Sequence, residues 1–253
     1  MSLLQLEGVS KAFGGLYAVK DITLEANVGE VLSIIGPNGA GKSTLFNLIT
    51  RIYDVTEGRV FFAGKEITKI APHKLASMGM SRTFQNIELF EGLTTLENVM
   101  VGGYIHGKIG FSESLLGIRN RSEEKRLKEM ALEKIQLIGL QDYVDVEALE
   151  MPYGRQRMVE VARAMMTSPQ ILLLDEPAAG LNAAETKELG QMLIKLRNEG
   201  VCVILIEHDM ETVMEVSDRI VVMNYGEKLA EGTPIEIQQN QEVISAYLGE
   251  EVF

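Results

Sequence analysis

Cysteine is almost missing from this chain of 253 residues. The single cysteine, Cys202, lies in the apolar run from Val201 to Ile206, so a disulfide within the chain is excluded and the thiol is expected in the core. The sequence has only three histidines besides, and no group of His and Cys has the spacing of a metal site. We therefore expect a protein of a reducing compartment.

Long apolar runs and an excess of basic residues are also missing. No run reaches the roughly 18 apolar residues of a membrane-spanning helix, and Met1 to Glu7 lack the basic region of a signal peptide. We expect a chain that neither crosses a membrane by itself nor carries a secretory leader. The formal net charge of −12 argues against a nucleic-acid partner, which requires clustered Lys and Arg, and against direct adsorption on anionic lipid.

A phosphate-binding motif directly follows the apolar run from Val31 to Ile35. It fits G-x-x-x-x-G-K-[ST] at every fixed position, and the residues expected to contact nucleotide are Gly36, Pro37, Asn38, Gly39, Ala40, Gly41, Lys42, Ser43 and Thr44. Glycines let backbone N–H groups approach phosphate oxygens, and the start of the following helix favours an anion. Lys42 would neutralise the β- and γ-phosphates, and the Ser43 hydroxyl would ligate Mg²⁺. The motif predicts a bound nucleoside triphosphate; the alternative is a glycine-rich turn that happens to hold a lysine.

Strand and helix patterns alternate after this loop. Short continuous apolar runs predict buried strands, whereas apolar residues at helical spacing predict helices. We expect helices over 43–50, 122–140, 158–167 and about 189–196, a last helix from Thr233, and strands over 59–63, 171–174 and 201–206. This alternation predicts an α/β fold with a doubly wound parallel sheet in a single domain.

Two adjacent acids, Asp175 and Glu176, follow the predicted strand 171–174. Parallel sheets place their ligand sites at this end of a strand. Asp175 would hold Mg²⁺, directly or through water, and Glu176 would orient and polarise the water that attacks the γ-phosphate. The alternative is an acidic turn closed by Pro177.

His208 and Gln85 are further candidates for the same chemistry. His208 follows the strand 201–206, where an imidazole would orient Glu176 and the γ-phosphate. The alternative for His208 is a histidine at a helix start that bonds to local backbone. Gln85 would reach Mg²⁺ or the attacking water with its amide, and the alternative there is a glutamine on a surface loop.

The order of these motifs resembles the nucleotide-binding subunits of ATP-binding cassette transporters. The motifs are the phosphate loop, the Gln85 loop, a turn at Met151–Arg157 that opens a helix, Leu-Leu-Leu-Asp-Glu-Pro, Ala179–Asn182 and His208. The resemblance covers nearly the whole chain and implies an ATPase that uses ATP and Mg²⁺. It also implies a P-loop NTPase fold over 1–253: a RecA-like parallel-sheet core, an N-terminal antiparallel β part, a helical arm over roughly 86–155 and a C-terminal helix over roughly 233–248.

The same resemblance implies a dimer of ATPase subunits with ATP between them. The turn at Tyr153, Gly154 and Arg155 of one subunit would cap the nucleotide on the phosphate loop of the other. Phe13 would stack on adenine, and Val19 would lie beside the base or sugar.

The turn departs from the family's Leu-Ser-Gly-Gly-Gln, because this chain has Met151-Pro152-Tyr153-Gly154-Arg155. Pro152 replaces the serine and offers neither a side-chain donor nor a backbone N–H. Gly154 and the helix start are kept, and Arg155 adds a cation. The alternative is that Pro152 only initiates the helix.

Segments 81–90 and 93–99 and the ending Ala246–Gly249 resemble the ATPase subunits of branched-chain amino acid importers. This implies an identical or related second ATPase subunit, separate membrane-spanning permease subunits, indirectly a solute-binding protein, and no nucleic acid. It places the chain on the cytoplasmic face of the cell membrane as a peripheral protein that is soluble when isolated. The segment from about Phe84 to Arg121, with apolar Ile87, Leu89, Phe90 and Leu93, is expected to contact the permease.

Two other functions stay open at this stage. A cassette ATPase of DNA repair or translation is disfavoured by the acidic charge, the missing long coiled coil and the single cassette in the chain. A nucleotide-gated binding module with low turnover is favoured only by Pro152. Nothing in the sequence identifies the transported solute.

Overall fold

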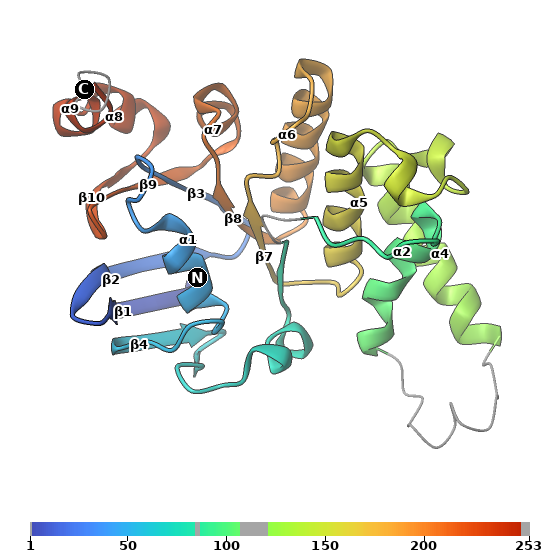
Figure 1. The fold of residues 1–253 in the computed structure, drawn as a ribbon, viewed down its shortest axis with the longest axis horizontal. Coiled ribbons are helices and arrows are strands. Elements are labelled where there is room, and N and C mark those ends of the chain that lie inside the picture. Colours follow the sequence, from blue (N-terminus) through green and yellow to red (C-terminus); the bar gives the residue numbers. More distant parts are fainter. Residues whose placement is uncertain (1, 84–86, 107–120, 249–253) are drawn as a thin grey trace.

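The computed structural model describes residues 2–83, 87–106 and 121–248, which form two sheets with helices around them (Figure 1). The N-terminal sheet is antiparallel, in the order β2-β1-β4-β5. Its strands are β1 (Ser2–Phe13), β2 (Leu16–Asn27), β4 (Glu57–Phe62) and β5 (Lys65–Glu66). The antiparallel β part implied by the family resemblance is therefore confirmed.

The second sheet has six strands in the order β10-β9-β3-β8-β7-β6 and is parallel from β9 to β6. Its strands are β3 (Val31–Ile35), β6 (Met80–Arg82), β7 (Ile171–Asp175), β8 (Cys202–Ile206), β9 (Arg219–Asn224) and β10 (Glu227–Gly232). The predicted parallel sheet is confirmed. The predicted strand–helix alternation is wrong at its far edge, because a two-residue turn at Tyr225 and Gly226 joins β9 to β10 as an antiparallel pair.

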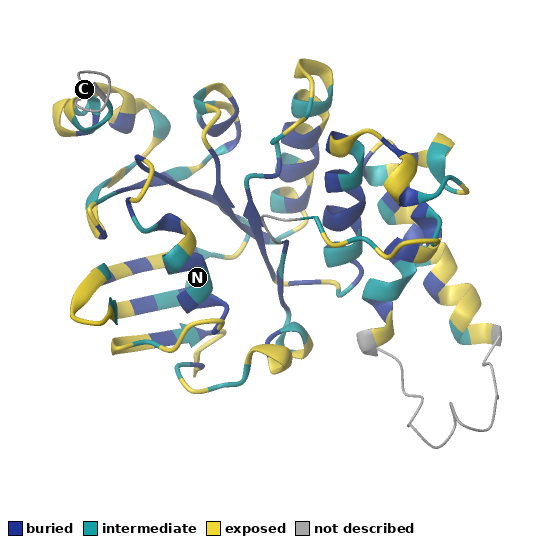
Figure 2. Ribbon diagram, viewed as in Figure 1, coloured by how far each residue is buried: buried dark blue, intermediate teal, exposed yellow. Residues whose placement is uncertain are grey.

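The central strands β3, β8 and β7 are buried along their whole length and separate two hydrophobic cores. Along β7, Ile171 and Leu173 belong to the first core, which includes the N-terminal sheet. Leu172 and Leu174 belong to the second core, on the opposite face. The period of two is that of a strand, so a continuous apolar run supplies both cores at once. Figure 2 shows these strands as a buried layer through the middle of the molecule.

Helices cover both faces of the parallel sheet (Figure 1). They are α1 (Lys42–Ile49), α2 (Thr95–Val101), α4 (Arg121–Leu137), α5 (Tyr153–Met165), α6 (Ala183–Asn198), α7 (Met210–Val216), α8 (Pro234–Gln239) and α9 (Gln241–Leu248). α1 packs in the first core, whereas α2, α4, α5 and α6 pack in the second. Within the described ranges, none of these helices is long and apolar enough to cross a membrane.

The C-terminal region differs from the single helix expected over 233–248. Thr233 and Glu236 form the predicted capping box, and Pro234 begins α8 as expected. The backbone of Asn240 is extended, at φ −77° and ψ 115°, and ends α8. The Asn240 side chain then accepts the N–H of Glu242 at 2.9 Å, so it starts α9 as a separate helix.

Candidate functional site

The loop between β3 and α1 turns so sharply that two of its positions require glycine. Gly36 has φ +152° and Gly41 has φ +97°. A Cβ at Gly36 would lie 2.2 Å from the Met223 carbonyl oxygen, and one at Gly41 would lie 2.5 Å from that of Ala18. No side-chain hydrogen bond caps the start of α1. The backbone N–H groups of its first turn can therefore serve an anion.

Lys42 places its ammonium against this loop. The side chain is buried, and Nζ donates to the carbonyl oxygens of Gly36 at 2.6 Å and Pro37 at 3.0 Å. The cation thus lies against the backbone that a phosphate would contact. Ser43 follows as an exposed residue in the first turn of α1, where its hydroxyl can reach a ligand.

The parallel strands bring the other predicted residues to the same edge of the sheet. β7 ends at Asp175, and its neighbour β8 ends just before Glu207 and His208. On the other side of β7, β6 ends at Arg82. The carboxyl ends of parallel strands meet at one edge, where the loop after β3 also lies. The structure therefore groups Asp175, Glu176 and His208 at the sheet edge that carries the phosphate loop.

Asp175 is a buried carboxylate that is only half satisfied. Its Oδ2 accepts a hydrogen bond from Arg82 Nη2 at 3.2 Å, and the side chain is 2% exposed. Its Oδ1 has no hydrogen-bond partner among the described residues. Burial raises the pKa of the Asp175 carboxyl, and the Arg82 guanidinium opposes that rise. A buried carboxylate oxygen that accepts no hydrogen bond is well suited to be a ligand of a metal cation.

Arg82 is a site residue that the sequence analysis did not identify. Its Nη1 donates to Asn47 Oδ1 on α1 at 2.6 Å and to Thr50 Oγ1, just after α1, at 3.0 Å. With its bond to Asp175, Arg82 therefore ties the helix behind the phosphate loop to the acidic end of β7. Its position at the end of β6, beside β7, comes from the fold and is not visible in the sequence.

Glu176 and His208 form a close pair across two loops. His208 Nε2 lies 2.7 Å from Glu176 Oε1, and their side chains are 47% and 25% exposed. Glu176 has φ +51°, which is unusual for a residue with a side chain, and its N–H donates to the Ile206 carbonyl at 2.9 Å. The pair is fixed by its backbone yet open to solvent, so substrate and water can reach it.

The remaining predicted contacts of the nucleotide have different outcomes. Phe13 is 48% exposed, and its ring centre lies 5.4 Å from that of Tyr53 in an edge-to-face contact. The exposed part of the Phe13 ring can therefore stack on a planar ligand. Val19 is fully buried in the first core. Its side chain has no open surface, which contradicts the expected contact with a base or sugar. Gln85 lies outside the described residues.

The turn at Tyr153, Gly154 and Arg155 begins α5 and packs against the loop that follows β7. A Cβ on Gly154 would lie 2.7 Å from the Gly180 carbonyl oxygen. Tyr153 is 53% exposed. Arg155 is engaged within its own chain, with Nε 3.5 Å from Glu185 Oε1 and its guanidinium 4.1 Å from the centre of the Tyr143 ring. Tyr153 thus offers more open surface than Arg155 to a ligand from outside the chain.

Comparisons with known proteins agree with this arrangement. The chain matches the family model described as ABC transporter over residues 19–179, and that described as branched-chain amino acid ATP-binding cassette transporter over residues 227–252. It is 45% identical to the high-affinity branched-chain amino acid transport ATP-binding protein BraF of Pseudomonas aeruginosa and 44% identical to LivG of Escherichia coli K12. Each match covers 250 residues, 98% of this chain and 98% of the relative.

Solved structures resemble this chain in the same way. A structure of the ADP conformation of an ATP-binding cassette of an ABC transporter has a TM-score of 0.83 and 32% identity, and covers 98% of this chain and 99% of its own. A dimeric structure of a bacterial ABC transporter cassette has a TM-score of 0.80 and 27% identity, and covers 92% and 99%. The likeness therefore includes both sheets and the helices around them.

Proposed function

This chain belongs to the ATP-binding cassette family of ABC transporters, and from that premise we propose that it is the ATP-hydrolysing subunit of an importer for branched-chain or other hydrophobic amino acids. Two similar relatives are named as high-affinity branched-chain amino acid transport ATP-binding proteins. The match at the C-terminal end is to a cassette family of the same description. In this proposal the chain supplies the nucleotide chemistry, while membrane subunits and a solute-binding protein recognise the solute.

One observation carries the ATPase part of the proposal. Lys42, Asp175 and the Glu176–His208 pair meet at a single edge of the parallel sheet. This edge then holds a cation for the phosphates, an acid for a metal ion and a candidate base for water. Hydrolysis proceeds by in-line attack of water on the γ-phosphate, with ADP as the leaving group.

Glu176 and His208 share the work of positioning the water. The Glu176 carboxylate accepts a hydrogen bond from the attacking water and polarises it. His208 holds that carboxylate by the 2.7 Å contact. In this proposal its ring would also interact with the γ-phosphate. Lys42 balances the charge of the β- and γ-phosphates.

The residues at this edge fit Mg²⁺, because Asp175 Oδ1 is buried without a donor in the described part of the chain. Asp175 and the Ser43 hydroxyl would hold the ion. The predicted third ligand, Gln85, lies outside the described residues. When bound, Mg²⁺ neutralises phosphate charge.

A second ATPase subunit completes the site in this proposal. α1, which follows the phosphate loop, packs in the first core, and α5, which begins at Tyr153, packs in the second (Figure 1). The helices that follow the phosphate loop and the Tyr153 turn therefore lie on opposite faces of the sheet. A paired subunit brings its own turn to the nucleotide, in keeping with the dimeric structure of a similar cassette.

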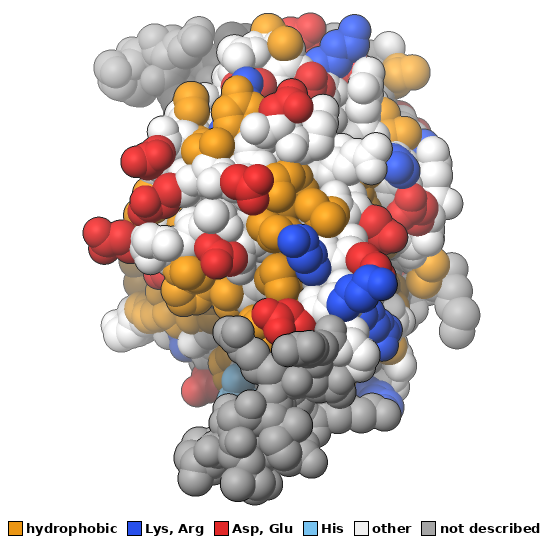
Figure 3. Space-filling model, turned by 90° about the vertical axis from the view of Figure 1, so that its right-hand side faces the viewer, with side chains coloured by type: hydrophobic (Ala, Val, Ile, Leu, Met, Phe, Trp, Pro, Cys, Tyr) orange, Lys and Arg blue, Asp and Glu red, His pale blue; other side chains and the backbone are white. Residues whose placement is uncertain are grey.

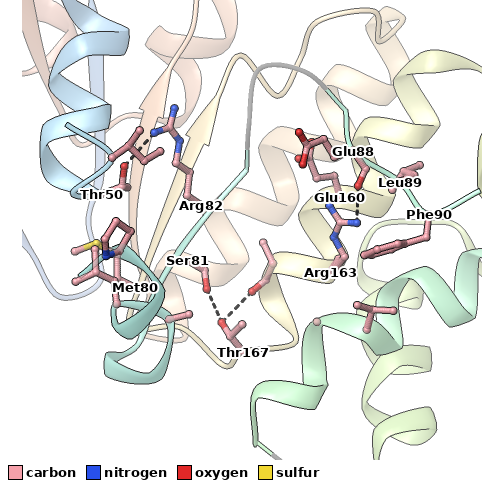
Figure 4. Close-up of a pocket in the computed structure, with 17 residues that line it drawn as sticks. Thr50, Met80, Ser81, Arg82, Glu88, Leu89, Phe90, Glu160, Arg163 and Thr167 are labelled. Atoms are coloured by element: carbon pink, nitrogen blue, oxygen red, sulfur yellow. Dashed lines mark hydrogen bonds between the residues drawn. The ribbon is translucent and has the colours of Figure 1, made fainter. Parts of the chain in front are cut away.

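The membrane subunits are proposed to dock in a groove of about 510 Å³ between β6, α5 and the segment before α2 (Figure 4). Leu89 and Phe90, both from the predicted docking segment, line this groove. Phe90 is 49% exposed, and Arg163, which donates to the Glu88 carbonyl at 2.6 Å, lies over its ring at 5.5 Å. The adjoining side of the molecule mixes apolar and charged side chains (Figure 3). Docking there would place the chain at the cytoplasmic face of the membrane.

Phosphate release by the purified chain with Mg·ATP tests the proposal. Glu176→Gln should lower turnover by about 100-fold or more, because an amide cannot act as a general base. ATP should then hold the variant as a dimer in size-exclusion chromatography. Glu188→Gln, an exposed change on α6, serves as the control. A wild-type chain that binds ATP but releases no more phosphate than Glu176→Gln would favour a nucleotide-gated binding module instead.

A further inference from the structure

Glu207 is a buried carboxylate at the carboxyl end of β8, and its oxygens accept hydrogen bonds from two different loops. It is 4% exposed. Oε1 accepts the N–H of Ala178 at 2.7 Å, and Oε2 accepts the N–H of His208 at 3.1 Å. One side chain therefore joins the loop after β7 to the loop after β8.

These two loops carry the two members of the Glu176–His208 pair. Ala178 lies two residues after Glu176, and His208 is the neighbour of Glu207 itself. The loops are also tied by the backbone bond from Glu176 to Ile206, at 2.9 Å. The 2.7 Å contact between Glu176 and His208 therefore depends on how these two loops are held together. Among the described residues, Glu207 is the only side chain that hydrogen-bonds to both loops.

The loop that Glu207 holds also supports the Tyr153 turn. The N–H of Leu181 donates to the Ala178 carbonyl at 3.1 Å and closes a tight turn around Gly180. A Cβ on Gly180 would lie 2.8 Å from Tyr153 Cδ1, and one on Gly154 would lie 2.7 Å from the Gly180 oxygen. Because these backbones touch, a shift of Ala178 would displace both Glu176 and the Tyr153 turn.

We propose that Glu207 is a positioning residue for hydrolysis, which holds Glu176 and His208 in their reacting geometry and couples that geometry to the Tyr153 turn. A carboxylate suits this place because both of its oxygens accept, whereas an amide has one acceptor and would turn N–H donors toward a backbone N–H. Burial raises the pKa of Glu207, and the backbone N–H groups oppose that rise.

The inference rests on the proposed ATPase reaction, so its test combines turnover with a readout that needs no turnover. We expect Glu207→Gln to lower kcat by about tenfold or more while KM for ATP changes less than about twofold, because Lys42 and the phosphate loop do not contact Glu207. The ring-nitrogen NMR shifts of His208 should change in the same variant, even without nucleotide. In a chain that already carries His208→Ala, the further change Glu207→Gln should lower kcat much less than it does in the wild-type chain, because the two residues act as a unit.

Glu215→Gln, an exposed acid on α7, is the matched control and should leave all three measurements unchanged. Wild-type kcat and unchanged His208 shifts in Glu207→Gln would overturn the positioning role. Parallel losses of kcat, ATP affinity and melting temperature would also overturn it, since they would indicate a purely structural residue. An inactive wild-type chain would refute the proposed function, whereas the His208 shifts would still report on Glu207.

Discussion

Individual residues at the nucleotide edge are held by hydrogen bonds to nearby backbone. The Lys42 side chain donates to two carbonyls of the phosphate loop, and the Glu176 N–H donates to the Ile206 carbonyl at the end of β8. Such bonds preorganise the charged atoms before ATP arrives, so little side-chain ordering is left to be done on binding.

Lys42→Ala should weaken ATP binding by about 10- to 100-fold. The reason is the loss of a charged hydrogen bond to phosphate, typically worth about 1.5–3 kcal/mol. Calorimetry of ATP binding to the purified chain measures the change, with Lys128→Ala on the exposed side of α4 as the control. Equal ATP affinity in wild type and Lys42→Ala would refute the role of this loop.

The start of α5 offers a second substitution, at Pro152. This residue is the N-cap of α5, and no side-chain hydrogen bond caps the helix. Pro152→Ser should tighten the ATP-bound dimer, because a well-placed hydroxyl bond to phosphate contributes about 1.5–3 kcal/mol. Loss of the proline constraint offsets about 0.4–1 kcal/mol of that gain.

The measurement for Pro152→Ser is the ATP-dependent monomer–dimer equilibrium in the Glu176→Gln background. Melting temperature without nucleotide is the control, since a serine that only caps its own helix would raise it and leave the dimer constant unmoved. That result, or a weaker dimer, would mean that the turn does not face the phosphate.

Leu89 and Phe90 are neighbours in the proposed docking segment, but we expect Leu89 to support the fold and Phe90 to contact the membrane subunits. Leu89 is partly buried against the second core, whereas Phe90 is half exposed in the groove. Phe90→Asp should therefore abolish recovery with the membrane subunits while the fold and ATP binding are kept. Leu89→Asp should destabilise the chain itself. Copurification measures binding to the membrane subunits, and thermal unfolding measures the stability of each variant. Normal copurification of a folded Phe90→Asp chain would show that Phe90 does not contact the membrane subunits.

The strands and helices differ in how far the sequence predicted them. The phosphate loop, the buried strands β7 and β8 and the α8 cap depend on neighbouring residues, so their patterns are visible in a short window. Arg82 and Glu207 escaped prediction because their partners, Asp175 and Ala178, are distant in sequence. Val19 was misplaced because the family resemblance gave a position without its burial. The extent of the helical arm, 86–155, and the roles of the site residues stay predictions.

At the scale of the whole molecule, a single buried thiol makes the stability of the fold depend on pH. Cys202 is fully buried in β8, and burial raises its pKa from 9.0 to about 12. Between these values the unfolded chain has lost the thiol proton while the native chain keeps it, so stability should fall as pH rises from 9 toward 12.

The expected slope from this thiol approaches about 1.4 kcal/mol per pH unit inside that window. Urea unfolding of wild type and Cys202→Ala at several pH values measures it, because other titrating groups are common to both chains. Parallel stability curves for the two chains would contradict the burial of the thiol.

The two faces of β7 supply different hydrophobic cores, and this determines which substitutions affect one another. Leu172 and Leu173 are adjacent in β7 but pack against different sets of neighbours. Substitutions of these two residues should combine additively, as they do for distant sites, while pairs within one core should depend on one another. Each face of the sheet can then drift in sequence under its own packing constraints, while Asp175, at the end of the same strand, stays in place.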